Sequence, residues 1–291
     1  MNKVFFAGFL LIFLSCAQEV RARPLRAFVS ILPQKFFVEK IGGDLVDVAV
    51  MVEPGASPHT YEPKPKQMVA LAKTSVYFAI GIPFETIWLE KITATNPNML
   101  VVHTEAGIPK IPMKAYHHEG SPREQGHSGI KDPHVWLSPP LVMILAGNIL
   151  KALLHLDPAH GSVYEKNHTS FLKELVVLDG EIRAALRGKG KSLEFMVFHP
   201  SWGYFAQAYG LEQVSIEVEG KEPKPADLQY LIQYARKRGI KVVFVQPQFS
   251  WLAAQAIAKS IDGQIVFVDP LAADWATNLR QVASKFKAAL E

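Results

Sequence analysis

Short apolar runs alternate with helix-length segments along most of this 291-residue chain. Glycine and proline residues, such as Gly42-Gly43 and Pro54-Gly55, separate the runs from the helical segments. Strands that alternate with helices are typical of βα units, in which the strands form a parallel sheet. The sequence therefore predicts an α/β protein of two lobes, each built on a mainly parallel four-stranded sheet with flanking helices. The expected strands are residues 27–31, 47–52, 76–80, 99–103, 195–198, 214–218, 242–245 and 265–268.

Two helices are predicted between the two sets of strands. Ser138 is expected to cap the first, with Pro139 at its first position, and Asp157-Pro158 repeats this signature for the second. Apolar residues of the second helix recur at spacings of three and four over 159–186, which at 1.5 Å per residue is roughly 40 Å. We interpret this helix as a strut between the lobes. The expected division is a signal peptide (1–22), an N-terminal lobe (23–157), a linker helix (158–187) and a C-terminal lobe (188–291).

The N-terminus resembles an export signal. Lys3 precedes an apolar run over residues 4–14, the length of a signal-peptide core and too short to span a bilayer. Cleavage after Val20-Arg-Ala22 gives a mature chain from Arg23, whereas Phe13-Leu-Ser-Cys16 resembles a lipobox and places a lipid on Cys16. We expect a periplasmic protein, or one tethered by lipid to the outer side of the cytoplasmic membrane.

Composition narrows the function. Apolar residues at 49% and charged residues at 20% are typical of a globular chain, and a net charge of +4 without a basic stripe disfavours nucleic-acid binding. Cys16 is the only cysteine, so the mature domain has no disulfide and no thiolate ligand. Any bound metal ion must therefore be held by histidine and carboxylate groups.

Four residues are candidate metal ligands. His199 and Asp269 each follow an apolar strand, and ligands of open α/β sheets bind at the carboxyl ends of parallel strands. His59 and His134 lie in proline-bounded loops of the first half, and Trp136 is expected to pack beneath His134 and exclude water. Taken singly, each residue has an ordinary structural explanation. Together, three imidazoles and one carboxylate suit zinc or a similar divalent ion in a cleft between the lobes.

The candidate set favours binding over catalysis. Four protein ligands close a tetrahedral shell and leave no open position for a reacting water molecule, so we expect no enzyme activity. A secreted zinc-dependent hydrolase is the rival, and it would also need a base. We interpret Glu217 and Glu219 as surface charges at a strand end. The polar segment 113–132 carries His117, His118 and His127, either as an auxiliary metal collector or as a solvated loop.

Five motifs, in this order, resemble the metal-specific substrate-binding proteins of bacterial ABC transporters, the zinc and manganese uptake group. The resemblance covers nearly the whole mature chain. The motifs are Glu53-Pro-Gly-Ala-Ser-Pro-His-Thr-Tyr-Glu-Pro63, Asp132-Pro-His-Val-Trp-Leu-Ser138, Val197-Phe-His-Pro200, Pro247-Gln-Phe-Ser250 and Val268-Asp-Pro-Leu271.

The resemblance implies two lobes joined by a rigid helix, with one metal ion between them held by His59, His134, His199 and Asp269. Histidine at the third position is associated with zinc in this group, in agreement with the softness of nitrogen ligands; Mn²⁺ and Fe²⁺ are the weaker candidates. It also implies delivery to a membrane ABC permease, and we expect a monomer whose metal affinity falls below about pH 6. A receptor for a chelated metal, or an adhesin of the same architecture, is the second rival.

Overall fold

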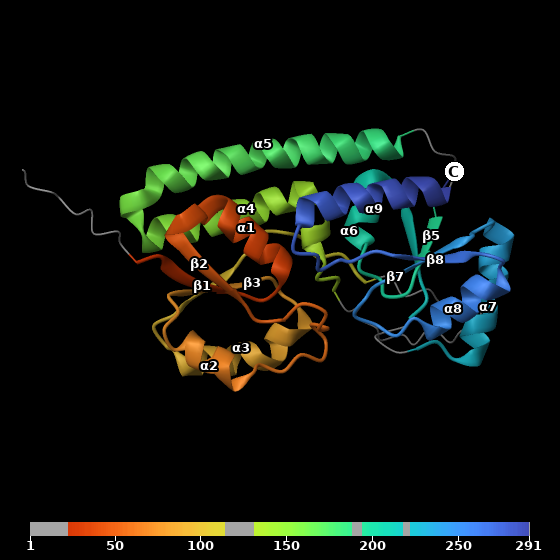
Figure 1. Ribbon diagram of the computed structural model, residues 1–291, viewed down its shortest axis with the longest axis horizontal. Helices are drawn as coiled ribbons and strands as arrows, with labels where there is room; N and C mark the ends of the chain where they lie inside the picture. Colours follow the sequence, from red (N-terminus) through yellow and green to blue (C-terminus); the bar gives the residue numbers. More distant parts are fainter. Residues whose placement is uncertain (1–22, 114–130, 188–193, 218–221, 291) are drawn as a thin grey trace, which may run out of the picture.

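The N-terminal lobe is a layered α/β unit in the computed structural model, which describes residues 23–113, 131–187, 194–217 and 222–290. Its parallel sheet has the strand order β2-β1-β3-β4. Helices α1 and α4 cover one face of this sheet, and α2 and α3 cover the other (Figure 1). The elements are β1 (Leu25–Val29), α1 (Leu32–Gly42), β2 (Val46–Val50), α2 (Pro65–Leu71), β3 (Val76–Ala79), α3 (Pro83–Thr95), β4 (Leu100–His103) and α4 (Pro139–Leu156).

The C-terminal lobe repeats this architecture with the parallel strand order β6-β5-β7-β8. Side chains alternate through its central strands: Phe195 and Phe244 face the core shared with α9, whereas Met196 and Val243 face a second core beneath α7 and α8. The elements are β5 (Glu194–Val197), α6 (Gly203–Tyr209), β6 (Glu212–Ser215), α7 (Pro225–Arg238), β7 (Val242–Val245), α8 (Leu252–Ser260), β8 (Gln264–Phe267) and α9 (Trp275–Leu290).

The predicted fold class is confirmed, and each expected strand is present with its ends displaced by no more than about three residues. Such displacements are usual for boundaries taken from one sequence. The strut is also present: a short 3-10 turn, Pro158–His160, leads into α5 (Gly161–Leu186). Gly180 lies within α5 without interrupting it.

Ser138 and Asp157 occupy the predicted N-cap positions, each followed by proline, but neither side chain makes a capping hydrogen bond. The side chain of Ser138 makes no capping hydrogen bond, because prolines occupy the first two positions of α4 and the first free amide, that of Leu141, already donates to the Ser138 carbonyl at 2.9 Å. The carboxylate of Asp157 instead accepts hydrogen bonds from the Tyr164 hydroxyl (2.6 Å) and from Nδ1 of His160 (2.8 Å).

Helix α5 lies across both lobes (Figure 1). It contacts α1 and α4 of the N-terminal lobe and α6 and α9 of the C-terminal lobe. Six side chains are buried on its inner face, the first two seven residues apart and the others three or four apart: Tyr164, Phe171, Leu175, Leu178, Ile182 and Leu186. They belong to one apolar cluster that includes residues of both lobes. The helix is therefore part of a continuous core, which resists rearrangement because interiors are close-packed.

Two tryptophans join the lobes directly. Nε1 of Trp136, in a 3-10 turn over Val135–Leu137, donates to the carbonyl of Pro270 at 2.8 Å, and Nε1 of Trp275 donates to the carbonyl of Trp136 at 2.8 Å. The ring of Trp275 also packs edge-on against Phe37 of α1, with centroids 5.0 Å apart. Both indoles are almost completely buried, so neither hydrogen bond is open to competition from water.

Among the described helices, α4 is long and apolar enough to cross a membrane by length and composition. In this structure its apolar side is buried against α5 and α1. Helix α4 is therefore part of the apolar core that the two lobes share.

Neighbouring residues of α5 allow a matched test of this core. Leu175 is 1% exposed, whereas Val176 is 61% exposed. Leu175→Ala should lower the free energy of unfolding by about 2–5 kcal/mol, because it leaves a cavity in the shared core. Val176→Ala should change it by no more than about 0.5 kcal/mol. Urea unfolding of both variants checks the difference, and equal effects would show that α5 is not packed as described.

Candidate metal centre

Three of the four predicted ligands come together between the lobes. The ring centroids of His59 and His199 lie 5.0 Å apart, and those of His134 and His199 lie 5.3 Å apart. His59 is in the loop after β2, His134 precedes the 3-10 turn before α4, and His199 follows β5. Two loops of the N-terminal lobe and one strand end of the C-terminal lobe therefore bring three imidazoles to one place.

His199 is held tightly by buried polar groups. Its Nδ1 lies 2.6 Å from Oε1 of Glu217, and both side chains are about 3% exposed. Gln246 fixes the backbone: its Oε1 accepts from the His199 amide at 3.1 Å, and its Nε2 donates to the His199 carbonyl at 2.7 Å. Phe249 stacks on the imidazole, with centroids 4.4 Å apart. This imidazole therefore has little freedom to turn.

The other nitrogen of His199 is the one available to a ligand. An ionised carboxylate only accepts hydrogen bonds, so the contact with Glu217 places the imidazole proton on Nδ1 and leaves a lone pair on Nε2. Nε2 is buried, and no hydrogen-bond partner lies near it within the described ranges. A buried nitrogen lone pair without a partner costs free energy, and a bound cation would remove that cost.

His134 is oriented in the same way. Its Nδ1 lies 2.7 Å from Oδ1 of Asp132, and the same oxygen accepts the His134 amide at 2.9 Å. The rings of His134 and Trp136 have centroids 5.1 Å apart, so the tryptophan packs against the histidine as expected. A carboxylate on the outer nitrogen of a metal-binding histidine fixes the ring and raises its basicity.

His59 is the histidine whose proton affinity is most clearly reduced. Burial, together with the nearby His199 and His134, lowers the pKa of the His59 imidazole to about 4. Burial also lowers the pKa of His199, although the hydrogen bond to Glu217 opposes this effect. A metal ion need not displace a proton from His59 at neutral pH, and proton competition at this imidazole begins well below the expected pH 6.

The three histidines line a small hollow. Its volume is about 20 Å³, and the other residues around it are mainly apolar, including Trp136, Phe249 and Pro270. This volume accommodates one water molecule or one ion. Pockets for organic ligands have volumes of about 300–1,000 Å³, so the hollow does not fit the chelated metal of the second rival.

Asp269 is not brought into this hollow. Its Oδ1 accepts hydrogen bonds from Nε2 of Gln248 (2.7 Å) and from the Leu271 amide (2.9 Å). It lines a separate hollow of about 220 Å³, and Gln248 and Leu271 border both hollows. As the side chains stand, the described part of the chain contains no group of three or more His, Cys, Asp or Glu residues arranged to hold a metal ion.

The predictions for the other histidines and for the nearby carboxylates have different outcomes. His117, His118 and His127 lie outside the described residues, as does Glu219. The interpretation of Glu217 as a surface charge was wrong, because Glu217 is 2% exposed and supports His199. The supporting role of Asp132 was not predicted either. Its position two residues before His134 was the available signal.

A sequence profile of one protein family, described as "Zinc-uptake complex component A periplasmic", matches residues 28–289. The "Iron-binding protein YfeA" of Yersinia pestis is 28% identical over 242 residues, which cover 81% of this chain and 75% of that protein. The "Zinc-binding protein AdcA" of Streptococcus pyogenes is 27% identical over 273 residues; these cover 89% of this chain but only 53% of the relative.

A solved structure gives the same fold with higher identity. The structure titled "Crystal structure of ZnuA" superposes with a TM-score of 0.85 at 43% sequence identity, and the match covers 92% of this chain and 100% of that one. The two-lobe architecture and the long helix are therefore shared with a solved protein.

The low pKa of His59 makes the metal-free protein sensitive to acid. The unfolded chain takes up the proton near pH 6.5 and the folded chain only near pH 4. Because the unfolded state binds more protons in this interval, stability falls as the pH drops from about 6.5 to about 4, by roughly 2–3 kcal/mol from this group. Denaturant unfolding of chelator-treated protein at several pH values checks this, and His59→Gln should flatten the dependence. An equally steep dependence in that variant would show that other groups cause it.

Proposed function

Because the chain belongs to the family of periplasmic A components of zinc-uptake complexes, we propose that it is an extracytoplasmic receptor that captures a divalent transition metal ion, zinc in the first place, and delivers it to an ABC permease for import. One observation carries the proposal. Imidazoles from both lobes converge on a hollow with room for one ion, and Nε2 of His199 is buried there without a described partner.

The proposed ligands are His59, His134, His199 and Asp269. Nε2 is the ligating nitrogen of His134 and His199, because Nδ1 of each ring faces a carboxylate. Asp269 completes the set by a change of side-chain conformation from its present contact with Gln248. Three neutral nitrogens and one carboxylate oxygen are a typical shell for zinc and a poor one for Mg²⁺ or Ca²⁺.

The remaining parts of the proposal concern the mature protein and its partners. Residues 1–22 are a signal peptide, and Cys16 is the site of a lipid anchor if the lipobox is processed. The lobes are residues 23–157 and 188–291, with 158–187 as the linker. The protein works as a monomer that presents its metal to the permease and catalyses no reaction. Any role of His117, His118 and His127 is that of an auxiliary collector.

His199→Ala tests the ligand set. It removes the central imidazole of the cluster, so the zinc dissociation constant should rise by two orders of magnitude or more, roughly the loss of one ligand bond. Competition with a chelating dye, with elemental analysis of the purified wild-type protein, measures this. His103→Ala is the control, because His103 is exposed and is not among the residues that line the hollow.

The outcomes distinguish a wrong choice of metal from a wrong assignment of the receptor function. One tightly bound zinc per chain supports the proposal, whereas manganese or iron at one per chain overturns only the choice of metal. An unchanged zinc affinity in His199→Ala would overturn the site.

The shared core predicts only small lobe motion. Solution scattering profiles of the metal-free and zinc-bound proteins should nearly superpose, because the core that includes α5 and the contacts of Trp136 and Trp275 does not depend on metal. A clear decrease in the radius of gyration on zinc addition would contradict this expectation and would indicate hinge closure instead.

A further inference from the structure

We infer that Tyr204 is a positioning residue: its hydroxyl ties the two lobes together beside the metal site and thereby fixes His134 for metal capture. The inference rests on the proposed function, because it concerns a ligand of that site. Tyr204 belongs to α6 of the C-terminal lobe, whereas the groups that it contacts belong to the N-terminal lobe.

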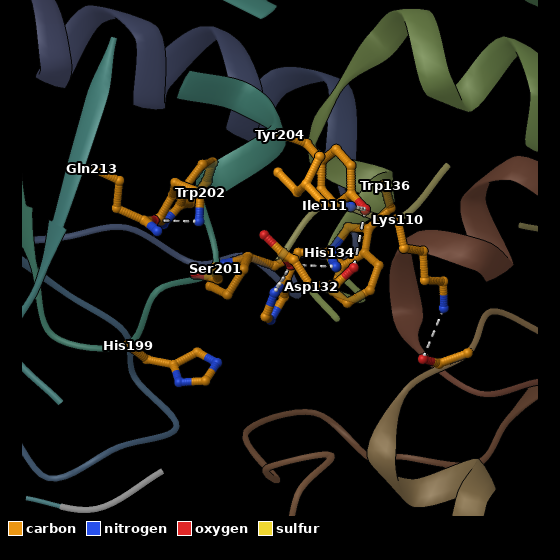
Figure 2. Close-up of polar contacts among 12 residues, drawn as sticks. Lys110, Ile111, Asp132, His134, Trp136, His199, Ser201, Trp202, Tyr204 and Gln213 are labelled. Atoms are coloured by element: carbon orange, nitrogen blue, oxygen red, sulfur yellow. Dashed lines mark hydrogen bonds and ion pairs between the residues drawn. The ribbon is translucent and has the colours of Figure 1, made fainter. Parts of the chain in front are cut away.

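The Tyr204 hydroxyl both accepts and donates a hydrogen bond. It accepts a hydrogen bond from the amide of Ile111 at 3.1 Å and donates one to the carbonyl of Asp132 at 3.1 Å (Figure 2). Ile111 and Asp132 are themselves paired, because the Asp132 amide donates to the Ile111 carbonyl at 2.9 Å. Tyr204 is 3% exposed, so water does not replace these bonds easily. The hydroxyl therefore clamps two backbone segments of the opposite lobe.

Asp132 connects this clamp to the metal site. Its carbonyl accepts from Tyr204, while its carboxylate holds Nδ1 of His134 at 2.7 Å. Tyr204 follows His199 by only five residues, so one short stretch of the C-terminal lobe provides both a proposed ligand and the support of another. The relative position of His134 and His199 is thus set by hydrogen bonds that exist without metal.

Gly203 allows α6 to approach the Asp132 carboxylate closely. A Cβ atom built on Gly203 would lie only 2.5 Å from Oδ2 of Asp132, which is far inside van der Waals contact. A side chain at position 203 must therefore displace the carboxylate that orients His134. Two neighbouring residues of α6 act on Asp132, one through its carbonyl and one by leaving space for its carboxylate.

Tyr204→Phe tests the clamp by removing only the hydroxyl. The Ile111 amide and the Asp132 carbonyl then lose this partner in a buried place, so zinc affinity should fall about tenfold. In the metal-free protein, hydrogen exchange at the Ile111 amide should become about tenfold faster or more. Dye competition measures the first quantity, and exchange resolved at Ile111 measures the second.

Tyr209→Phe is the matched control. Tyr209 also belongs to α6, and its hydroxyl donates to Asp179 of α5 at 3.0 Å, away from the metal site. This variant should bind zinc as the wild type does and leave Ile111 exchange unchanged. The inference is overturned if Tyr204→Phe matches it in zinc affinity, even where exchange at Ile111 is faster, because the bond would then be structural only.

Gly203→Ala gives an independent test that keeps the tyrosine hydroxyl. It should also weaken zinc binding by about tenfold or more, and the absorption bands of the Co²⁺-loaded protein should shift as His134 turns. Gly180→Ala on α5 is the control, because a Cβ there meets no atom within 4 Å. Unchanged cobalt bands and zinc affinity in Gly203→Ala would overturn the inference. If the wild type binds no zinc, the proposed function fails, and the exchange at Ile111 still decides whether the clamp exists.

Discussion

The indole of Trp275 lies where both lobes and the long helix meet, and the geometry of the histidine cluster depends on this contact. Trp275 donates a hydrogen bond to the Trp136 carbonyl, and Trp136 donates one to the Pro270 carbonyl. Each lobe therefore both donates a hydrogen bond to the other and accepts one from it. The ring packs against Phe37, which also contacts Phe171 of α5. The lobes therefore share one interior, and packing sets the positions of the histidines that they contribute.

Buried carboxylates give this preformed site its chemical character. Glu217 and Asp132 each lie behind an imidazole, at 2.6 Å from His199 and 2.7 Å from His134. Burial lowers the pKa of His199, and burial together with the nearby His199 and His134 lowers the pKa of His59 to about 4. The lowered pKa values of His59 and His199 reduce competition from protons for a divalent cation at the proposed site.

The fold was largely predictable because both sheets are parallel and covered on two faces, so their strands appear as continuous apolar runs; β7 has the expected bounds. The rule that ligands bind at the carboxyl ends of parallel strands pointed to His199 and Asp269, but His199 lines the small hollow and Asp269 lines the neighbouring one. The partners of Glu217, Asp269 and Tyr204 could not be predicted, because they depend on packing between segments distant in the sequence. Ser138 is the N-cap residue as predicted, but its side chain makes no capping bond, because two prolines follow it and the next amide, that of Leu141, donates to its carbonyl.

Pro112 pairs with Lys131, so the backbone that supports His134 is held in place at this pair and does not rely on the residues that lie between them in the sequence. The two backbones meet there in an antiparallel bridge, and the adjacent Ile111 and Asp132 are joined to each other and to Tyr204. A stem closed in this way holds its ends at a fixed spacing. The residues inserted beyond it can therefore be exchanged or shortened by design while the contact between Asp132 and the His134 imidazole stays the same.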